Sequence, residues 1–104
     1  MRLPNLAALR TFEASARHLS FVRAAGELNV QPPAVSRKAA ELERELNVSL
    51  FVRTKSRLTL TPEGERFFQA VSSGFGTIAQ SAEAMRKRPG SETIVVGISI
   101  GLAS

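Results

Sequence analysis

The side chains best suited to chemistry in this 104-residue chain are hydrogen-bond donors and cations in two short stretches, residues 31–37 and 53–57. They are Gln31, Ser36, Arg37, Arg53, Lys55 and Arg57. Amides and guanidinium groups can hydrogen-bond base edges, and cations at exposed turns can neutralise phosphates. The pattern therefore favours a polyanionic partner, of which nucleic acid is the commonest.

Groups that catalysis or metal binding would require are scarce. The chain has no cysteine, which excludes disulfides and most structural zinc sites. His18 is the only histidine, and we interpret it as a structural residue near a helix C-terminus. Glu41, Glu43 and Glu45 alternate along a helix and do not share a face. We expect no catalytic residue, metal or cofactor, and an enzyme is the weakest alternative.

The composition indicates one small domain with an appended element. Hydrophobic residues make up 43% of the chain, enough to bury a core, and the net charge is +5. An excess of basic residues can also serve only to keep a protein soluble, so the net charge alone does not identify a nucleic-acid partner. Without an apolar run of about twenty residues or a signal segment, we expect a cytoplasmic protein with no membrane partner.

Residues 20–46 predict two helices joined by a very short turn. Ser20 is a good N-cap, and Asn29 can adopt the left-handed conformation that ends a helix. Between them an apolar face recurs at helical spacing: Phe21, Ala24, Ala25 and Leu28. The second helix begins at the corner formed by Gln31, Pro32 and Pro33, since proline is tolerated in a first helical turn.

The second helix of this pair has two different faces. The inward face is Val35, Ala39, Leu42 and Leu46. The opposite face is Pro33, Ser36, Arg37, Ala40 and Arg44. A small, basic helix N-terminus of this kind fits the major groove of a duplex. The alternative is an ordinary helical hairpin with a solvated face.

A third helix is predicted before this pair. Asn5 would cap it, and it would run to about Arg17 with an apolar stripe of Leu6, Leu9, Phe12 and Ala16. We interpret Arg10 and Arg17 as solvated side chains. Gly26 is unexpected inside a helix, and close packing is the only reason that the sequence offers for it.

A β-hairpin is predicted over about residues 50–61, completing a winged helix-turn-helix domain at residues 1–61. Two short β-type segments flank the polar turn Lys55-Ser56-Arg57. With Arg53 at its base, this basic wing is placed to contact phosphates beside the groove. A simply solvated turn is the alternative.

Residues 62–88 predict a long C-terminal helix that begins after Thr61. It carries a heptad seam of Phe68, Val71, Phe75, Ile78, Ala82 and Met85. We expect this seam to pair with a second copy, although it could also pack on its own domain. The small residues at 72–76 would either bend the helix or allow a close approach. Residues 89–104 read as a hinge and the first, apolar strand of a truncated α/β domain.

The segments RTFEASARHLSFVRAAGELNVQPPAVSRKAAELERELNVSLFVR and LTLTPEGERF resemble the DNA-binding region of LysR-type transcriptional regulators, with a flavour of the glycine-cleavage-activator subgroup. The resemblance covers about residues 3–88. It implies a mainly α winged helix-turn-helix with a dimerisation helix, and homodimers that assemble into tetramers on double-stranded promoter DNA. It also implies a small-molecule effector bound by a C-terminal domain that is mostly absent from this sequence.

The resemblance also assigns roles to particular residues. Ser36, Arg37 and Arg53 would contact DNA, whereas Thr61 and Gly64 would be structural. Two departures from the family pattern affect base reading. Gln31-Pro32-Pro33 stands where Thr-Gln-Ser is usual, so the glutamine is shifted and Pro32 cannot hydrogen-bond a base. Ser56 stands where the wing usually has arginine, although Lys55 and Arg57 flank it.

The sequence therefore predicts a sequence-specific transcriptional regulator. Two further alternatives stay open. One is a protein-interaction module that dimerises without specific DNA readout, and the other is a non-specific DNA-packaging protein. The effector, the operator sequence and the choice between activation and repression cannot be read from these residues.

Overall fold

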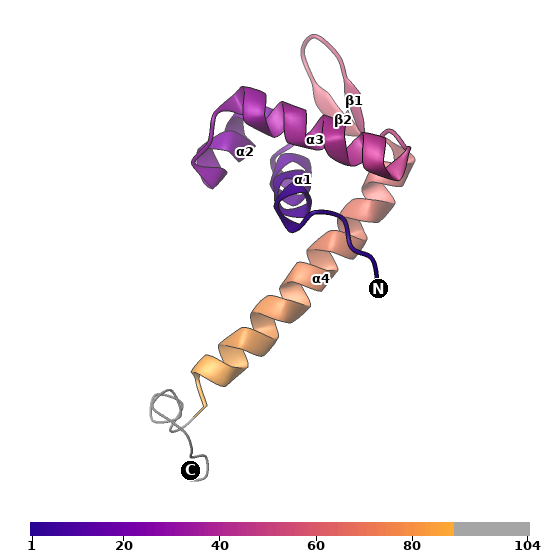
Figure 1. Ribbon diagram of the computed structural model, residues 1–104. Coiled ribbons are helices and arrows are strands. Elements are labelled where there is room, and N and C mark those ends of the chain that lie inside the picture. The colour runs from indigo at the N-terminus through magenta and orange to yellow at the C-terminus, as the bar shows by residue number, and fades with distance from the viewer. Residues whose placement is uncertain (89–104) are drawn as a thin grey trace. The chain divides into compact units, whose positions relative to one another are not determined.

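The computed structural model describes residues 1–88, and the hinge and strand predicted for residues 89–104 lie outside this range. The described part is mainly helical, with one two-stranded antiparallel hairpin (Figure 1). The elements in order are α1 (Leu6–His18), α2 (Phe21–Leu28), α3 (Pro32–Leu46), β1 (Phe51–Arg53), β2 (Leu58–Leu60) and α4 (Pro62–Arg86). The chain divides into two compact units, Met1–Ser72 and Ser73–Ser104, and α4 crosses the division.

Helices α1 and α2 begin at the side-chain caps that the sequence predicted. The Asn5 Oδ1 atom accepts a hydrogen bond from the Ala8 N–H at 3.0 Å. Ser20 Oγ accepts from the Arg23 N–H at 3.0 Å. Each bond satisfies an N–H group that has no partner within the first helical turn. The starts of α1 and α2 therefore follow from local chemistry alone.

The first three helices all end at a residue in the left-handed conformation. Asn29 and Asn47 have φ values of 59° and 56°, as their residue type predicts. Helix α1 ends at His18, one residue beyond the predicted end at about Arg17. The residue that follows, Leu19, has a φ of 50°. A leucine has no side-chain hydrogen bond to offset the steric cost of this conformation, about 1–2 kcal/mol.

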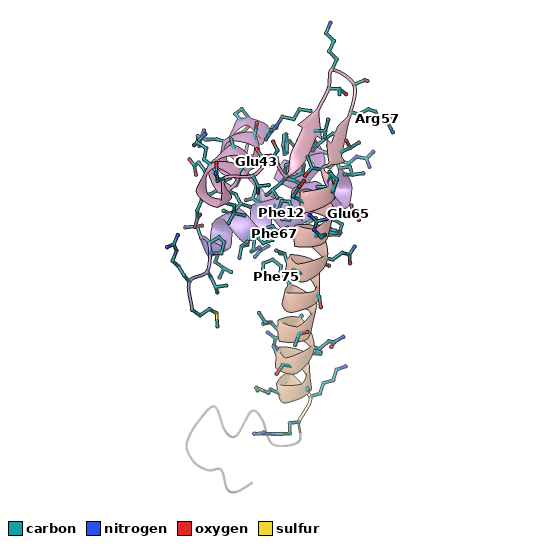
Figure 2. All side chains as sticks on the ribbon, turned by 90° about the vertical axis from the view of Figure 1, so that its right-hand side faces the viewer. Phe12, Glu43, Arg57, Glu65, Phe67 and Phe75 are labelled. Atoms are coloured by element: carbon teal, nitrogen blue, oxygen red, sulfur yellow. The ribbon has the colours of Figure 1, made fainter. Side chains whose placement is uncertain are left out.

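Phe12 lies at the centre of the core of the first unit and is fully buried. Its ring lies beside that of Phe67 on α4 (Figure 2), with 5.3 Å between the ring centroids. The centroid of the Phe51 ring on β1 is 5.5 Å away. The inward face of α3 is confirmed at Val35, Ala39 and Leu42, which are each at most 1% exposed, whereas Leu46 near its end is half-buried. Aromatic and aliphatic burial therefore joins α1, α3, the hairpin and the start of α4.

The predicted stripe of α1 is partly wrong. Leu6 is 62% exposed, whereas the small or polar residues Ala8, Thr11 and Ser15 are buried. The reason is that α2 and α3 both pack on α1, so burial extends around more of the helix than one stripe. The first turn of α1 receives no such cover on the side of Leu6.

The hairpin is joined to the beginning of α4. Thr61 Oγ1 donates to the Ser49 carbonyl at 2.7 Å and accepts from the Gly64 N–H at 2.9 Å. A Cβ atom at Gly64 would collide with the Leu50 carbonyl, so this close approach requires glycine. The structural roles predicted for Thr61 and Gly64 therefore have a physical basis.

At position 26, no contact within residues 1–88 requires glycine. A Cβ atom added there meets no other described side chain or neighbouring element within 4 Å. Close packing within residues 1–88 therefore does not explain this glycine, and that interpretation was wrong.

Candidate nucleic-acid interface

The corner before α3 presents an amide without an internal role. Gln31 is the N-cap of α3, but its side chain makes no capping hydrogen bond and is exposed. Its carbonyl accepts from the Ala34 N–H at 3.0 Å, and Pro32 occupies the start of the helix. The backbone therefore builds the helix start, and the Gln31 side chain is left available for an external partner.

The outer face of α3 is exposed where the sequence predicted contact residues. Pro33, Arg37 and Arg44 are exposed, and Ser36 is half-buried. Within residues 1–88, neither Arg37 nor Arg44 has an ion-pair partner. The helix therefore holds its guanidinium groups toward solvent on the side opposite its buried residues.

The wing tip carries two more cations of this kind. Lys55 and Arg57 are exposed, and Figure 2 shows Arg57 on the hairpin, away from the helical core. The Arg57 backbone closes the turn, because its carbonyl accepts from the Thr54 N–H at 3.0 Å. Neither side chain forms an ion pair with any described residue. The backbone thus fixes the turn while both charges remain free.

Arg53 differs from the other predicted contact residues. Its Nη2 atom donates to Glu43 Oε1 at 3.1 Å, and its guanidinium carbon lies 5.5 Å from the centroid of the Phe21 ring. The second oxygen of Glu43 accepts from the N–H groups of Leu50 and Phe51. From the sequence, Glu43 is considered only as a catalytic candidate, and no local pattern indicates its bonds to Leu50, Phe51 and Arg53.

A second group of ion pairs lies where α1 meets α2. Arg17 donates to Glu13 at 2.8 Å and to Glu27 at 2.7 Å, and His18 Nε2 lies 2.7 Å from Glu27 Oε1. Hydrogen bonds from Arg17 and then His18 lower the pKa of Glu27 to about 2. The bonds to Glu13 and Glu27 raise the pKa of Arg17. Arg17 is exposed, as predicted, and it also connects α1 to α2 through Glu27.

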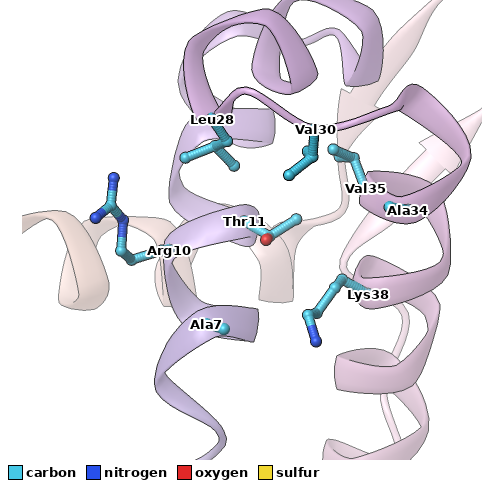
Figure 3. A pocket seen from close by; sticks show the side chains of 8 residues that line it. All are labelled: Ala7, Arg10, Thr11, Leu28, Val30, Ala34, Val35 and Lys38. Carbon is cyan, nitrogen blue, oxygen red and sulfur yellow. The ribbon is translucent and has the colours of Figure 1, made fainter.

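An apolar groove borders the other flank of α3 (Figure 3). Its volume is about 220 Å³. The lining residues are Ala7, Arg10, Thr11, Leu28, Val30, Ala34, Val35 and Lys38. The lining includes no carboxylate or imidazole, the groups that general acid–base chemistry most often uses. No cluster of three metal-ligating side chains occurs within the described residues.

The predicted seam of α4 is not uniform. In the first unit, Phe68 is half-buried and Val71 is only 8% exposed, so Val71 already belongs to the core of its own domain. In the second unit, Ile78 and Met85 are 66% and 62% exposed. None of the helices described in residues 1–88 is long and apolar enough to cross a bilayer.

These elements define the class of fold. A short helix pair, an exposed basic start to the second helix and a following hairpin make a winged helix-turn-helix. The family model for bacterial regulatory helix-turn-helix proteins of the lysR family matches residues 6–65. The chain therefore belongs to the LysR family.

Similar proteins agree with this assignment. The chain is 42% identical over 93 residues to the transcriptional activator AmpR of Citrobacter freundii, covering 89% of the chain and 32% of AmpR. It is 40% identical over 97 residues to the glycine cleavage system transcriptional activator of Escherichia coli K12, covering 93% and 32%. The chain thus spans about a third of the length of these curated relatives.

Solved structures of the same kind extend the comparison. A complex of BenM_DBD with benA site 1 DNA has a TM-score of 0.73 and 31% identity, covering 81% of this chain and 94% of that chain. Full-length CbnR complexed with its target DNA has a TM-score of 0.69 and 26% identity, covering 80% and 29%. The mainly α winged helix-turn-helix predicted from the sequence is confirmed.

Proposed function

We propose that this chain is the DNA-binding segment of a transcriptional regulator that recognises specific promoter sequences. One observation carries the proposal: the cations on the outer face of α3 and at the wing tip have no acidic partner within residues 1–88. Unpaired cations on adjacent exposed elements of one compact unit attract a polyanion. Two of the similar structures are complexes with DNA, which supports this choice of polyanion.

In this proposal the start of α3 enters the major groove. Arg37 is the principal base or phosphate contact, since a guanidinium can bond two acceptors of guanine at once. Ser36 and Gln31 assist it, and the prolines at 32 and 33 keep the helix start compact for close approach. Lys55 and Arg57 hold flanking phosphates, which fixes register without reading sequence.

Dimerisation would place two such domains on one operator. The described α4 has 25 residues, about 37 Å at about 1.5 Å per residue. Ile78 and Met85 supply the most exposed apolar surface of its later turns. Phe75 and Ala82 continue the same apolar face at spacings of three and four residues, and both are half-buried. Phe68 and Val71 would contribute less, because Val71 is already buried in its own domain. Two paired copies would contact half-sites separated by whole turns of the duplex.

The remaining properties of a whole regulator are also part of the proposal. The relatives named as activators are about three times as long as this chain, which leaves room for an effector-binding domain. A tetramer of two dimers, control by a small molecule, a cytoplasmic location and the absence of catalysis follow from the family resemblance. The similar proteins are transcriptional regulators, which supports the absence of catalysis.

The test selects duplexes from a random-sequence library with the wild-type chain and measures their affinity by fluorescence anisotropy across a salt series. We expect a consensus site, a tighter affinity for that site than for scrambled DNA, and a steep dependence on salt. Arg66→Ala is the control, since Arg66 is an exposed arginine of the same unit that lies on α4 rather than α3.

Other outcomes would favour the alternatives. Enrichment without a consensus and equal affinity for every duplex would indicate non-specific packaging. No salt-dependent binding to any duplex would exclude the proposal and favour a protein-interaction module.

A further inference from the structure

The Glu43 carboxylate makes a connection between α3 and the wing that the proposed DNA contacts do not require. Its Oε2 atom accepts from the N–H groups of Leu50 and Phe51 at 2.8 and 3.1 Å. Its Oε1 atom accepts from Arg53 Nη2 at 3.1 Å. The Glu43 side chain is only 13% exposed. One carboxylate on α3 therefore receives three donors, from Leu50 just before β1 and from Phe51 and Arg53 at its two ends.

Arg53 extends this connection to α2. Its guanidinium carbon is 5.5 Å from the centroid of the Phe21 ring and 5.8 Å from that of the Phe51 ring. These two rings are themselves 5.4 Å apart in an edge-on arrangement. The positive group thus lies against two aromatic rings and one carboxylate, a favourable position for a guanidinium.

The wing needs such an anchor because it is short. Each strand has three residues, paired from Phe51–Leu60 to Arg53–Leu58. A two-stranded hairpin of this size is at best marginally stable by itself. The strand that begins the wing is therefore oriented by groups outside the hairpin, since Glu43 accepts from the first amide of β1, at Phe51, and from the Leu50 amide just before it.

We propose that Glu43 is a positioning residue that sets the wing relative to the recognition face of α3, with Arg53 acting mainly as its counter-ion. This inference rests on the proposed function for its effect on DNA binding. Glu43 lies on the same helix as Arg37, so it fixes the distance between the base reader and the wing-tip cations. Loss of its bonds would let Lys55 and Arg57 move away from their phosphates while leaving α3 free to bind.

The central variant is Glu43→Gln, compared with Glu45→Gln. Both remove one negative charge from α3, but Glu45 is exposed and has no hydrogen-bond or ion-pair partner within the described residues. Glutamine keeps the size of Glu43, yet its NH₂ group must face either Arg53 or the backbone amides as a second donor. A difference between the variants therefore reports the geometry of the carboxylate rather than the charge of the chain.

The measurement is the salt dependence of affinity for the selected duplex, together with ethylation interference at its phosphates. Glu43→Gln should lower the magnitude of the salt slope by about two, the value for two lost phosphate contacts at roughly 0.9 each. Interference should disappear at the flanking phosphates and persist at those beside α3. Glu45→Gln should keep the wild-type slope and pattern.

A mutant cycle that combines Glu43→Gln with Lys55→Ala/Arg57→Ala separates an effect on the position of the wing from a general loss of stability. If Glu43 acts through the wing tip, Glu43→Gln should cost almost no further affinity in that background. An equal loss in both backgrounds, or a wild-type slope in Glu43→Gln, would overturn the inference. If Glu43→Gln unfolds at the assay temperature, Arg53→Gln takes its place and should show the same loss of flanking interference.

Hydrogen exchange at the Leu50 and Phe51 amides provides a readout without DNA. Both amides should exchange faster in Glu43→Gln than in the wild type, while the amides of α1 keep their protection. If the wild type selects no duplex but these two amides lose protection, the proposed function fails and the anchoring of the wing stands. If they stay protected, the anchoring itself is wrong.

Discussion

Two groups of cations in the unit Met1–Ser72 have opposite surroundings. Where α1 meets α2, Arg17 bonds to Glu13 and Glu27, and the His18 ring also lies within hydrogen-bond distance of Glu27. On the outer side of α3 and at the wing tip, Arg37, Lys55 and Arg57 have no ion-pair partner among residues 1–88. Glu13 and Glu27 thus neutralise a cation that joins two helices of the fold.

The difference separates stability from binding. An exposed ion pair contributes at most about 1 kcal/mol to folding, and its cation is partly neutralised, whereas an unpaired cation keeps its full charge for an external anion. Arg53 belongs with the paired group in its contacts, although its place in the sequence lies among the proposed DNA contacts. Variants of the paired cations should therefore change thermal stability, and variants of the unpaired cations should change DNA affinity.

The largest effect should come from Arg37→Ala. The loss of a bidentate contact to guanine should cost about 1–3 kcal/mol, a decrease in affinity of about 5- to 150-fold. Anisotropy titrations on the selected duplex measure this cost, and thermal unfolding should be unchanged because Arg37 is exposed and unpaired. Unchanged affinity would remove Arg37 from the role of reader and weaken the distinction between the two groups.

Lys55→Ala should have a smaller and more even effect. It removes one phosphate contact, so affinity should fall to a similar extent for consensus and scrambled duplexes, and the salt slope should decrease by about one. Titrations of both duplexes at several salt concentrations test this expectation. A loss confined to the consensus duplex would show that the wing reads bases.

Arg17→Ala should give the reverse result. It leaves Glu13 and Glu27 without their guanidinium, so the midpoint of thermal unfolding should decrease while DNA affinity stays at the wild-type value. Arg23→Ala is the control for stability, because Arg23 is an exposed arginine of α2 without an ion pair in the described residues. A large loss of DNA affinity in Arg17→Ala would place both groups of cations in the interface.

The smallest effect should be a change in acid stability. The pKa of Glu27 is lowered from 4.5 to about 2, so its ionised form is favoured in the folded state. The stabilisation is therefore fully present above pH 4.5 and lost as the pH falls toward 2. Glu27→Gln should flatten the pH dependence of unfolding in this window, whereas Glu45→Gln should not. Identical profiles for Glu27→Gln and the wild type would contradict the assigned ion pair.

Much of the local structure could be predicted because its causes act within a few residues. The Ser20 cap, the left-handed Asn29 and Asn47, and the apolar spacing of α3 all depend on near neighbours. The left-handed Leu19 could not be predicted in this way, since leucine has no intrinsic preference for that conformation.

In the candidate site too, some features follow from the local sequence and others depend on how the elements pack. The exposure of Gln31, Arg37, Lys55 and Arg57 agrees with their predicted positions on a helix face and a turn. The Glu13 partner of Arg17 lies four residues away on α1, so helical spacing could have predicted it. The partners Glu27 of Arg17 and Glu43 of Arg53 were missed because each is ten residues away on another element. Ion pairs across such a separation depend on how the helices pack and leave no periodic signal.

The sequence by itself determined the order of helices and hairpin, the basic corner at residues 31–37 and the resemblance to one family. Only the tertiary structure decided which cations are neutralised, why Gly64 must lack a side chain, and how Glu43 connects α3 to the wing. The physical reason is the range of the forces involved. Caps and periodicity act along the backbone, whereas ion pairs and steric contacts act between segments that only the folded core brings together.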